Sequence, residues 1–152
     1  MTNPAAQSYL KMRVMTATPE QLQLMLYDGA LRFAEQARAG LRERNYEQSY
    51  TNIVRVQKIL TELTASLKPD VDPDLCRNLS ALYTYVYKRL IAANVDHDPA
   101  ALDESIELLR YQRETWAMLL DKLGKDRAAT AARKLDMPEP DRRMEGAIRL
   151  SA

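Results

Sequence analysis

The segment from Thr18 to Ala34 places the strongest constraint on the fold, because it combines a helix start with two apolar helix faces. Thr18 suits the N-cap, Pro19 suits the first helical position, and Gln21 stands where a capping box needs its partner. A helix in a simple bundle buries one apolar stripe, so we expect one face to point into the core and the surplus face to bind a partner. The expected core face carries Leu22, Met25, Leu26, Gly29 and Phe33, and the surplus face carries Leu24, Tyr27, Leu31 and Ala34.

The dipeptide Asp28-Gly29 is unusual inside a helix, since glycine there costs about 1 kcal/mol relative to alanine. On the expected core face, Gly29 would permit the close approach of another helix or of a bulky ring. Asp28 has two interpretations, a solvated charge or a bond to a partner or to the N-terminal arm.

Three further helices follow, and each begins with a capping residue. The second starts at Asn45, the third at Asp72-Pro73 and the fourth at Asp98-Pro99, while Gly124 is suited to close the fourth. Helices of about 20 residues joined by short turns predict an all-α fold, an antiparallel up-down four-helix bundle. The expected inner stripes are Tyr46, Ser49, Ile53, Val56, Leu60, Leu63 and Leu67; then Leu75, Leu79, Leu82, Val86 and Leu90; then Leu102, Ile106, Leu109, Trp116, Leu120 and Leu123.

The two ends of the chain are expected to differ from the bundle, which spans residues 18–124. Residues 1–17 are predicted to form a short N-terminal arm, helical or extended, because its apolar residues do not suit a solvated tail; a partly ordered end is the alternative. Residues 125–152 are predicted to form a C-terminal tail, helical where Lys125–Lys134 is rich in alanine if Gly124 is tolerated, and mobile beyond Met137-Pro138.

Composition and charge exclude several classes of protein. The net charge is +1 with no concentrated basic block, which argues against nucleic-acid binding. The single Cys76 precludes an internal disulfide and fits a reducing compartment. No signal-peptide pattern is present, and no apolar run approaches the roughly 20 residues of a membrane span, so a soluble cytoplasmic protein without membrane insertion is predicted.

The residues that commonly carry catalysis are sparse. His97, the single histidine, lies in a turn between two predicted helices, whereas a phosphorelay histidine belongs in mid-helix. Cys76 has no histidine beside it and is interpreted as a small packing residue. The chain lacks a Glu-x-x-His pair for a metal, a glycine-rich phosphate loop and a Ser/His/Asp set, so we expect neither cofactor nor enzymatic activity.

The tyrosines instead indicate a binding surface. Tyr83 and Tyr87 are one helical turn apart and share a face. Tyrosine suits a groove that is sometimes exposed, although the rings could also merely cover the shoulders of the bundle. Surplus apolar faces of this kind produce grooves that accept an amphipathic partner helix. The residues predicted to line them are Leu24, Tyr27, Leu31, Val54, Ile59, Tyr83, Tyr87 and Leu90.

Four segments, over roughly residues 7 to 118, resemble the flagellar secretion chaperone family FliS. They are Tyr9 and Val14 before the first long helix; Leu22-x-x-Met25-Leu26-Tyr27-Asp28-Gly29-Ala30 within it; Asn78-Leu79-x-x-Leu82-Tyr83-x-Tyr85-Val86 with Leu90 and Ala93-Asn94; and Ile106–Arg110 through Thr115-Trp116. The chain departs from the family at Asp72-Pro73-Asp74, where many members have Gly-Gly-Glu, and at Thr84, where they often have Asp.

The resemblance implies a cytosolic chaperone without enzymatic activity. Family members hold newly made flagellin by its C-terminal segment, prevent premature polymerisation and support its delivery to the flagellar type III export apparatus. Components of the export gate, or regulators, are further partners that it implies. The N-terminal segment of the family can cover part of the client groove, so Tyr9, Leu10 and Val14 are interpreted as a removable lid.

Two other classes of function stay open. One is a helical adaptor bundle for another exported or regulatory client, which only the identity of the client would distinguish. The other is a histidine phosphotransfer bundle, which requires His97 to be exposed on a helix.

Overall fold

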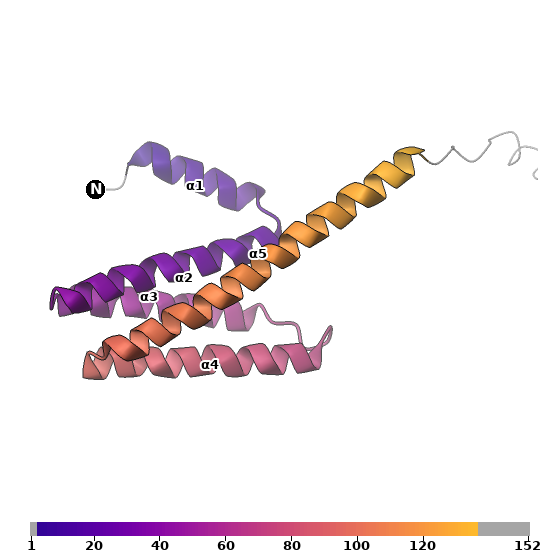
Figure 1. Cartoon of the computed structure of the whole chain (residues 1–152). Helices are drawn as coiled ribbons and strands as arrows, with labels where there is room; N and C mark the ends of the chain where they lie inside the picture. Colours follow the sequence, from indigo (N-terminus) through magenta and orange to yellow (C-terminus); the bar gives the residue numbers. More distant parts are fainter. Residues whose placement is uncertain (1–2, 137–152) are drawn as a thin grey trace, which may run out of the picture. The chain divides into compact units, whose positions relative to one another are not determined.

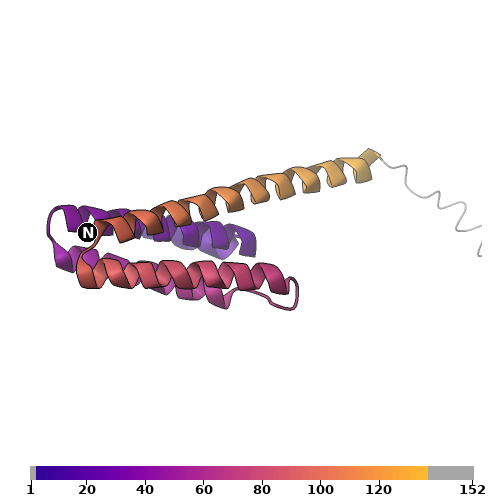
Figure 2. The same cartoon turned by 60° about the horizontal axis from the view of Figure 1, so that its bottom comes forward.

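The computed structural model describes residues 3–136, and within them the chain forms five α-helices and no strand. The helices are α1 (Pro4–Thr16), α2 (Pro19–Arg42), α3 (Tyr46–Ala65), α4 (Pro73–Asp96) and α5 (Pro99–Asp136). From α2 to the first half of α5, successive helices alternate in direction (Figures 1 and 2). The predicted all-α bundle is confirmed. The predicted mobile segment beyond Met137 lies outside the described residues.

The chain divides into two compact units, and the division falls within α5, between Ala117 and Met118. The first unit holds α1 to α4 and the first half of α5, and the described part of the second is the remaining length of α5. Gly124 does not close the helix as predicted, because α5 continues to Asp136. A Cβ atom at Gly124 would meet no other atom within 4 Å, and the alanine-rich sequence beyond it favours continued helix.

The predicted helix starts are confirmed by their hydrogen bonds. The Gln21 amide donates to the Thr18 hydroxyl at 3.2 Å, and the Thr18 amide donates to the Gln21 side chain at 3.0 Å, which completes the capping box. The Asn45 and Asp72 side chains each accept from the amide three residues ahead, at 3.2 and 3.1 Å. Each cap satisfies an amide that the first helical turn leaves unpaired, so these boundaries are encoded locally.

The core is formed by one stripe from each helix between α2 and α5. Most of the predicted inner stripes of α3, α4 and α5 are buried, but Leu75 is 53% exposed and Tyr46 is 42% exposed, so both of these assignments are wrong. Both residues lie in the first turn of their helices, where fewer neighbouring side chains surround them. The buried apolar residues are Tyr27, Ala30, Ala34 and Ala37; Ile53, Val56, Leu60 and Leu63; Tyr83, Val86, Leu90 and Ala93; and Ala101, Leu102, Ile106 and Leu109.

On α2 the prediction of the buried face is wrong in part: Gly29, assigned to the core, is buried, but so are two residues of the other face. Tyr27 and Ala34, assigned to the surplus face, are buried, whereas Leu22 and Met25, assigned to the core, are only half-buried. The Tyr27 side is buried because its hydroxyl is bonded to that of the buried Tyr83 of α4, whereas Leu22 and Met25 lie at the hollow beside α1. Toward α3 the packing is close, since a Cβ atom at Gly40 would lie 2.8 Å from the backbone nitrogen of Ser49.

Candidate functional site

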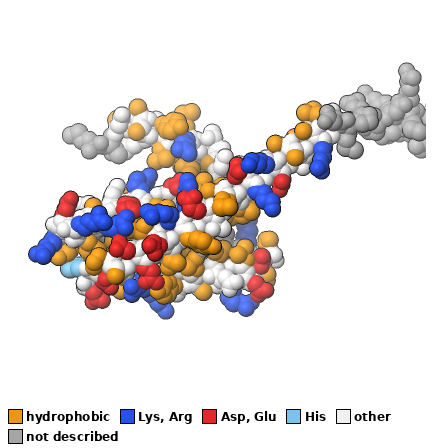
Figure 3. Space-filling model, in the orientation of Figure 1, with side chains coloured by type: hydrophobic (Ala, Val, Ile, Leu, Met, Phe, Trp, Pro, Cys, Tyr) orange, Lys and Arg blue, Asp and Glu red, His pale blue; other side chains and the backbone are white. Residues whose placement is uncertain are grey.

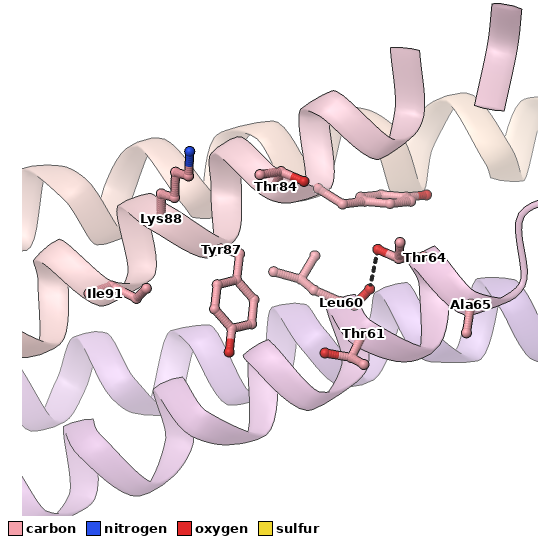
Figure 4. A pocket seen from close by; sticks show the side chains of 9 residues that line it. Leu60, Thr61, Thr64, Ala65, Thr84, Tyr87, Lys88 and Ile91 are labelled. Carbon is pink, nitrogen blue, oxygen red and sulfur yellow. Dashed lines mark hydrogen bonds between the residues drawn. The ribbon is translucent and has the colours of Figure 1, made fainter. Parts of the chain in front are cut away.

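An open apolar groove lies between α3 and α4. Its volume is about 580 Å³, and the close-up in Figure 4 shows the residues that line it. Tyr87 reaches from α4 toward α3, beside Leu60 (Figure 4). Tyr87 and Ile91 are 39% and 45% exposed, so large apolar side chains are open to solvent. The lining comprises Leu60, Thr61, Thr64, Ala65, Tyr83, Thr84, Tyr87, Lys88 and Ile91.

The threonines on the α3 side of the groove have their hydroxyls occupied within the helix. The Thr64 hydroxyl donates to the Leu60 carbonyl at 2.8 Å, and the Thr61 hydroxyl donates to the Gln57 carbonyl at 3.1 Å. Neither hydroxyl therefore needs a bond from a partner, and this wall presents mainly apolar atoms. Such a wall fits the apolar face of a helix better than a polar small molecule.

A pair of buried tyrosine hydroxyls lies beneath the groove. Tyr83 from α4 and Tyr27 from α2 are 1% and 2% exposed, and their hydroxyls are hydrogen-bonded to each other. Burial raises the pKa of both hydroxyls above the ordinary value of 10.0, and for Tyr83 the bond to Tyr27 raises the pKa further. Both groups are therefore neutral at physiological pH, and each satisfies the other inside the core.

The predicted groove residues fall into three sets. Tyr83 and Tyr87 meet in the α3/α4 groove. Tyr27 and Leu90 are buried in the core and do not line the groove, so their assignment to it is wrong. Outside these, the half-buried residues are Leu24, Leu31, Val54 and Ile59.

Sequence reasoning missed seven residues of this groove: Leu60, which it assigned to the core, and Thr61, Thr64, Ala65, Thr84, Lys88 and Ile91. Ile91 follows Tyr87 by four residues and could have been found from helical spacing alone. Lys88 and Thr84 carry no apolar signal, so only the packing of α3 beside α4 identifies them.

A second hollow, of about 570 Å³, lies between α1 and α2. Leu10, Arg13 and Val14 of α1 contribute to it together with Leu22, Met25, Leu26, Asp28 and Arg32 of α2. The arm is thus helical, and none of its described residues is buried. Tyr9, the remaining residue of the predicted lid, is 65% exposed and lines no described hollow. In the space-filling view, hydrophobic side chains are visible on α1 and, among charged ones, over the bundle (Figure 3).

Ion pairs and one indole bond join α2 to the first half of α5. Arg113 contacts Asp28 at 2.8 Å, an ion pair with α5 that neither interpretation of Asp28 named, and Arg110 contacts Glu35 at 3.2 Å. The Asp28 carboxylate raises the pKa of the Arg113 guanidinium. The Trp116 indole donates to the Glu20 carbonyl at 2.9 Å. This side of the bundle is therefore closed by polar contacts, unlike the α3/α4 side.

Gly29 does not have the steric role expected of it. It is buried beside Ile59, but a Cβ atom there would lie 3.5 Å from the Ile59 Cδ1 atom, an ordinary contact distance. No bulky ring or close backbone requires a glycine at this position.

The residues considered for chemistry lie apart from one another. His97 ends α4 in the left-handed conformation, with φ of 50°, and stacks on Tyr46 with ring centroids 3.8 Å apart. It is therefore not on the mid-helix face that a phosphorelay requires. Cys76 is half-buried near the start of α4. Within residues 3–136, no group of His, Cys, Asp and Glu could hold a metal ion, and no helix is long and apolar enough to cross a membrane.

Comparison with known proteins identifies relatives of this arrangement. Residues 1–123 match the family described as flagellar protein FliS. The flagellar secretion chaperone FliS of Bacillus subtilis (strain 168) is 32% identical over 120 residues, which is 79% of this chain and 89% of that protein. The chaperone of the same name from Escherichia coli (strain K12) is 31% identical over 76% of this chain and 85% of the Escherichia coli protein.

A solved structure described as a flagellar chaperone from bacteria has a TM-score of 0.65 at 18% identity. The similarity covers 78% of this chain and 99% of that one, and it supports the fold.

Proposed function

The chain belongs to the FliS family of flagellar proteins, and from this we propose that it is a cytosolic export chaperone for flagellin. In this proposal it binds the C-terminal segment of flagellin, prevents premature polymerisation and supports delivery to the flagellar type III export apparatus. It acts by binding alone, without catalysis. The observation that carries the proposal is the open apolar groove between α3 and α4, since this is where an amphipathic client helix would fit.

The energetics suit a client that must later be released. Each apolar anchor that becomes buried would contribute about 1.5–3 kcal/mol, while ordering a disordered segment would cost roughly 2–5 kcal/mol or more. Tyr87 and Ile91 are the anchors available at the groove, above the floor formed by Tyr83. Further turns of the client would contact the half-buried apolar residues Leu24, Leu31, Val54 and Ile59.

The arm is proposed to act as a lid through Tyr9, Leu10 and Val14. Leu10 and Val14 lie beside apolar residues of α2 that a client could otherwise contact. A covered site lowers apparent affinity by the fraction of molecules in which it is open. Deletion of residues 1–15 is therefore expected to tighten client binding in calorimetric titration. Weaker binding after the deletion would make the arm part of the site and exclude a lid.

The decisive experiment is calorimetric titration with the C-terminal segment of the flagellin from the same organism. We expect one-to-one binding with a negative heat-capacity change, and no binding of a flagellin that lacks this segment. Tyr87→Ala should weaken binding by roughly tenfold or more, since it removes an apolar side chain that the bound client would bury. Tyr111→Ala is the matched control, because Tyr111 is 68% exposed on α5 and lines no described hollow. Absence of wild-type binding would exclude flagellin as the client.

A further inference from the structure

Three hollows along α4 are lined by positively charged residues and by no negatively charged ones. The α3/α4 groove shares Thr84 and Lys88 with a second hollow of about 490 Å³, which shares Arg77 and Ser80 with a third of about 340 Å³. Lys88 and Arg77 are the charged residues that line these three hollows, and no Asp or Glu lines any of them. The continuous surface is therefore apolar with a basic edge.

Lys88 is the cation best placed to meet a ligand. It is exposed, and the structure gives it no ion pair among the described residues. No acidic residue stands three or four positions from it along α4. Figure 4 shows its ammonium group directed away from α3, at the edge of the groove, while Tyr87 reaches inward. Arg77, by contrast, already contacts Asp74 at 3.1 Å.

The arm of this chain does not match that edge. α1 contains no Asp or Glu and carries Lys11 and Arg13, so its charge would oppose Lys88. Its apolar residues Leu10 and Val14 lie instead at the α1/α2 hollow. The α3/α4 groove therefore calls for an occupant of different charge.

We infer that the α3/α4 groove selects an amphipathic client helix whose polar edge carries a carboxylate positioned over Lys88. This inference rests on the proposed function and adds a rule for recognising the client. An exposed ion pair adds little affinity, but it speeds association. It also fixes the position of the client helix along the groove, which apolar contacts alone do not specify. Lys88 would thus determine which turn of the client lies beside Tyr87 and Ile91.

The test compares Lys88→Glu with Lys122→Glu in titrations with the C-terminal flagellin segment at low and high salt. Lys122 is an exposed helical lysine outside the hollows along α4, so both variants change the net charge equally. Lys88→Glu should weaken binding by roughly tenfold at low salt and less at high salt, because screening reduces the repulsion. Lys122→Glu should bind as the wild type does, and both variants should keep the wild-type thermal midpoint.

A charge-swap scan completes the test. Each Asp or Glu of the segment is replaced in turn by Lys, and one replacement is expected to weaken wild-type binding yet restore binding to Lys88→Glu. If Lys88→Glu and Lys122→Glu both bind the segment as tightly as the wild type, and no replacement restores binding to Lys88→Glu, this inference is overturned and the proposed function stands. Absence of wild-type binding would overturn both.

Discussion

The two sides of α3 show how side-chain size decides whether neighbouring helices close together or leave a groove. Toward α2 the contact is tight at two glycines: Gly29 lies beside Ile59, and an added Cβ at Gly40 would lie 2.8 Å from the backbone of Ser49. Toward α4 the contact contains Tyr83 and Tyr87, and a groove of about 580 Å³ remains. Small residues permit close backbone approach, whereas the large ring of Tyr87 closes the α3/α4 seam only partly and stays 39% exposed.

The comparison of the two sides of α3 shows that the most hydrophobic side chains are not always the ones that the fold buries. The closed seam contains two glycines of α2, which carry no side chain, whereas the open groove presents the partly exposed side chains of Tyr87 and Ile91. A chaperone needs the second arrangement, because a client can only bury surface that the fold has left exposed.

The largest effect is expected from Tyr83→Ala, which removes a buried ring that lines the α3/α4 groove and is bonded to Tyr27 of α2. Loss of the ring and of the hydroxyl partner of Tyr27 should lower the free energy of unfolding by about 3–5 kcal/mol, measured by urea denaturation. Tyr87→Ala is the control on the open side of the same seam, and its partly exposed ring should matter much less for stability. If both variants lose the same free energy of unfolding, the buried ring of Tyr83 contributes no more to stability than the exposed ring of Tyr87.

The next effect concerns the closed side. Gly40→Ala should lower the free energy of unfolding by about 1–3 kcal/mol, because the new methyl group meets the backbone of Ser49 and Asn45 rather than a movable side chain. Gly29→Ala is the matched control: its methyl group has room beside Ile59, and it should raise stability by up to about 1 kcal/mol through helix propensity. If both substitutions stabilise the protein, the α2/α3 contact is looser than the structure indicates.

The buried hydroxyl pair of Tyr27 and Tyr83 is expected to have a smaller effect, a dependence of the free energy of unfolding on alkaline pH. The pKa values of Tyr27 and Tyr83 are raised in the folded protein, so above the ordinary value of 10.0 the unfolded chain loses these protons first. The free energy of unfolding should therefore fall as pH rises above that value, by at most about 1.4 kcal/mol per pH unit for each hydroxyl.

The double variant Tyr27→Phe with Tyr83→Phe removes both titrating groups without leaving a single unpaired hydroxyl. Its stability, measured by denaturation across alkaline pH, should decline less steeply than that of the wild type. An unchanged alkaline slope would place the responsible groups elsewhere in the protein.

The caps at Thr18, Asn45 and Asp72 could be predicted because each depends on a side chain and an amide three residues apart. The α3/α4 groove could be predicted only in part. Helical spacing pointed to Tyr83 and Tyr87, but it also nominated Tyr27 and Leu90, which the core encloses. Lys88 gave no signal, since a lone lysine on a helix is usually a solvated residue.

The starts of the bundle's helices and its all-α class follow from local sequence alone, because capping and helical periodicity act over a few residues. Which apolar residues of α2 become buried depended on the packing of the helices. Periodicity marks two apolar faces on α2, but the hydroxyl bond between Tyr27 and the buried Tyr83 of α4 draws the Tyr27 face into the core, while Leu22 and Met25 lie at the hollow beside α1. These contacts join residues far apart in the chain, so no single segment of sequence contains them.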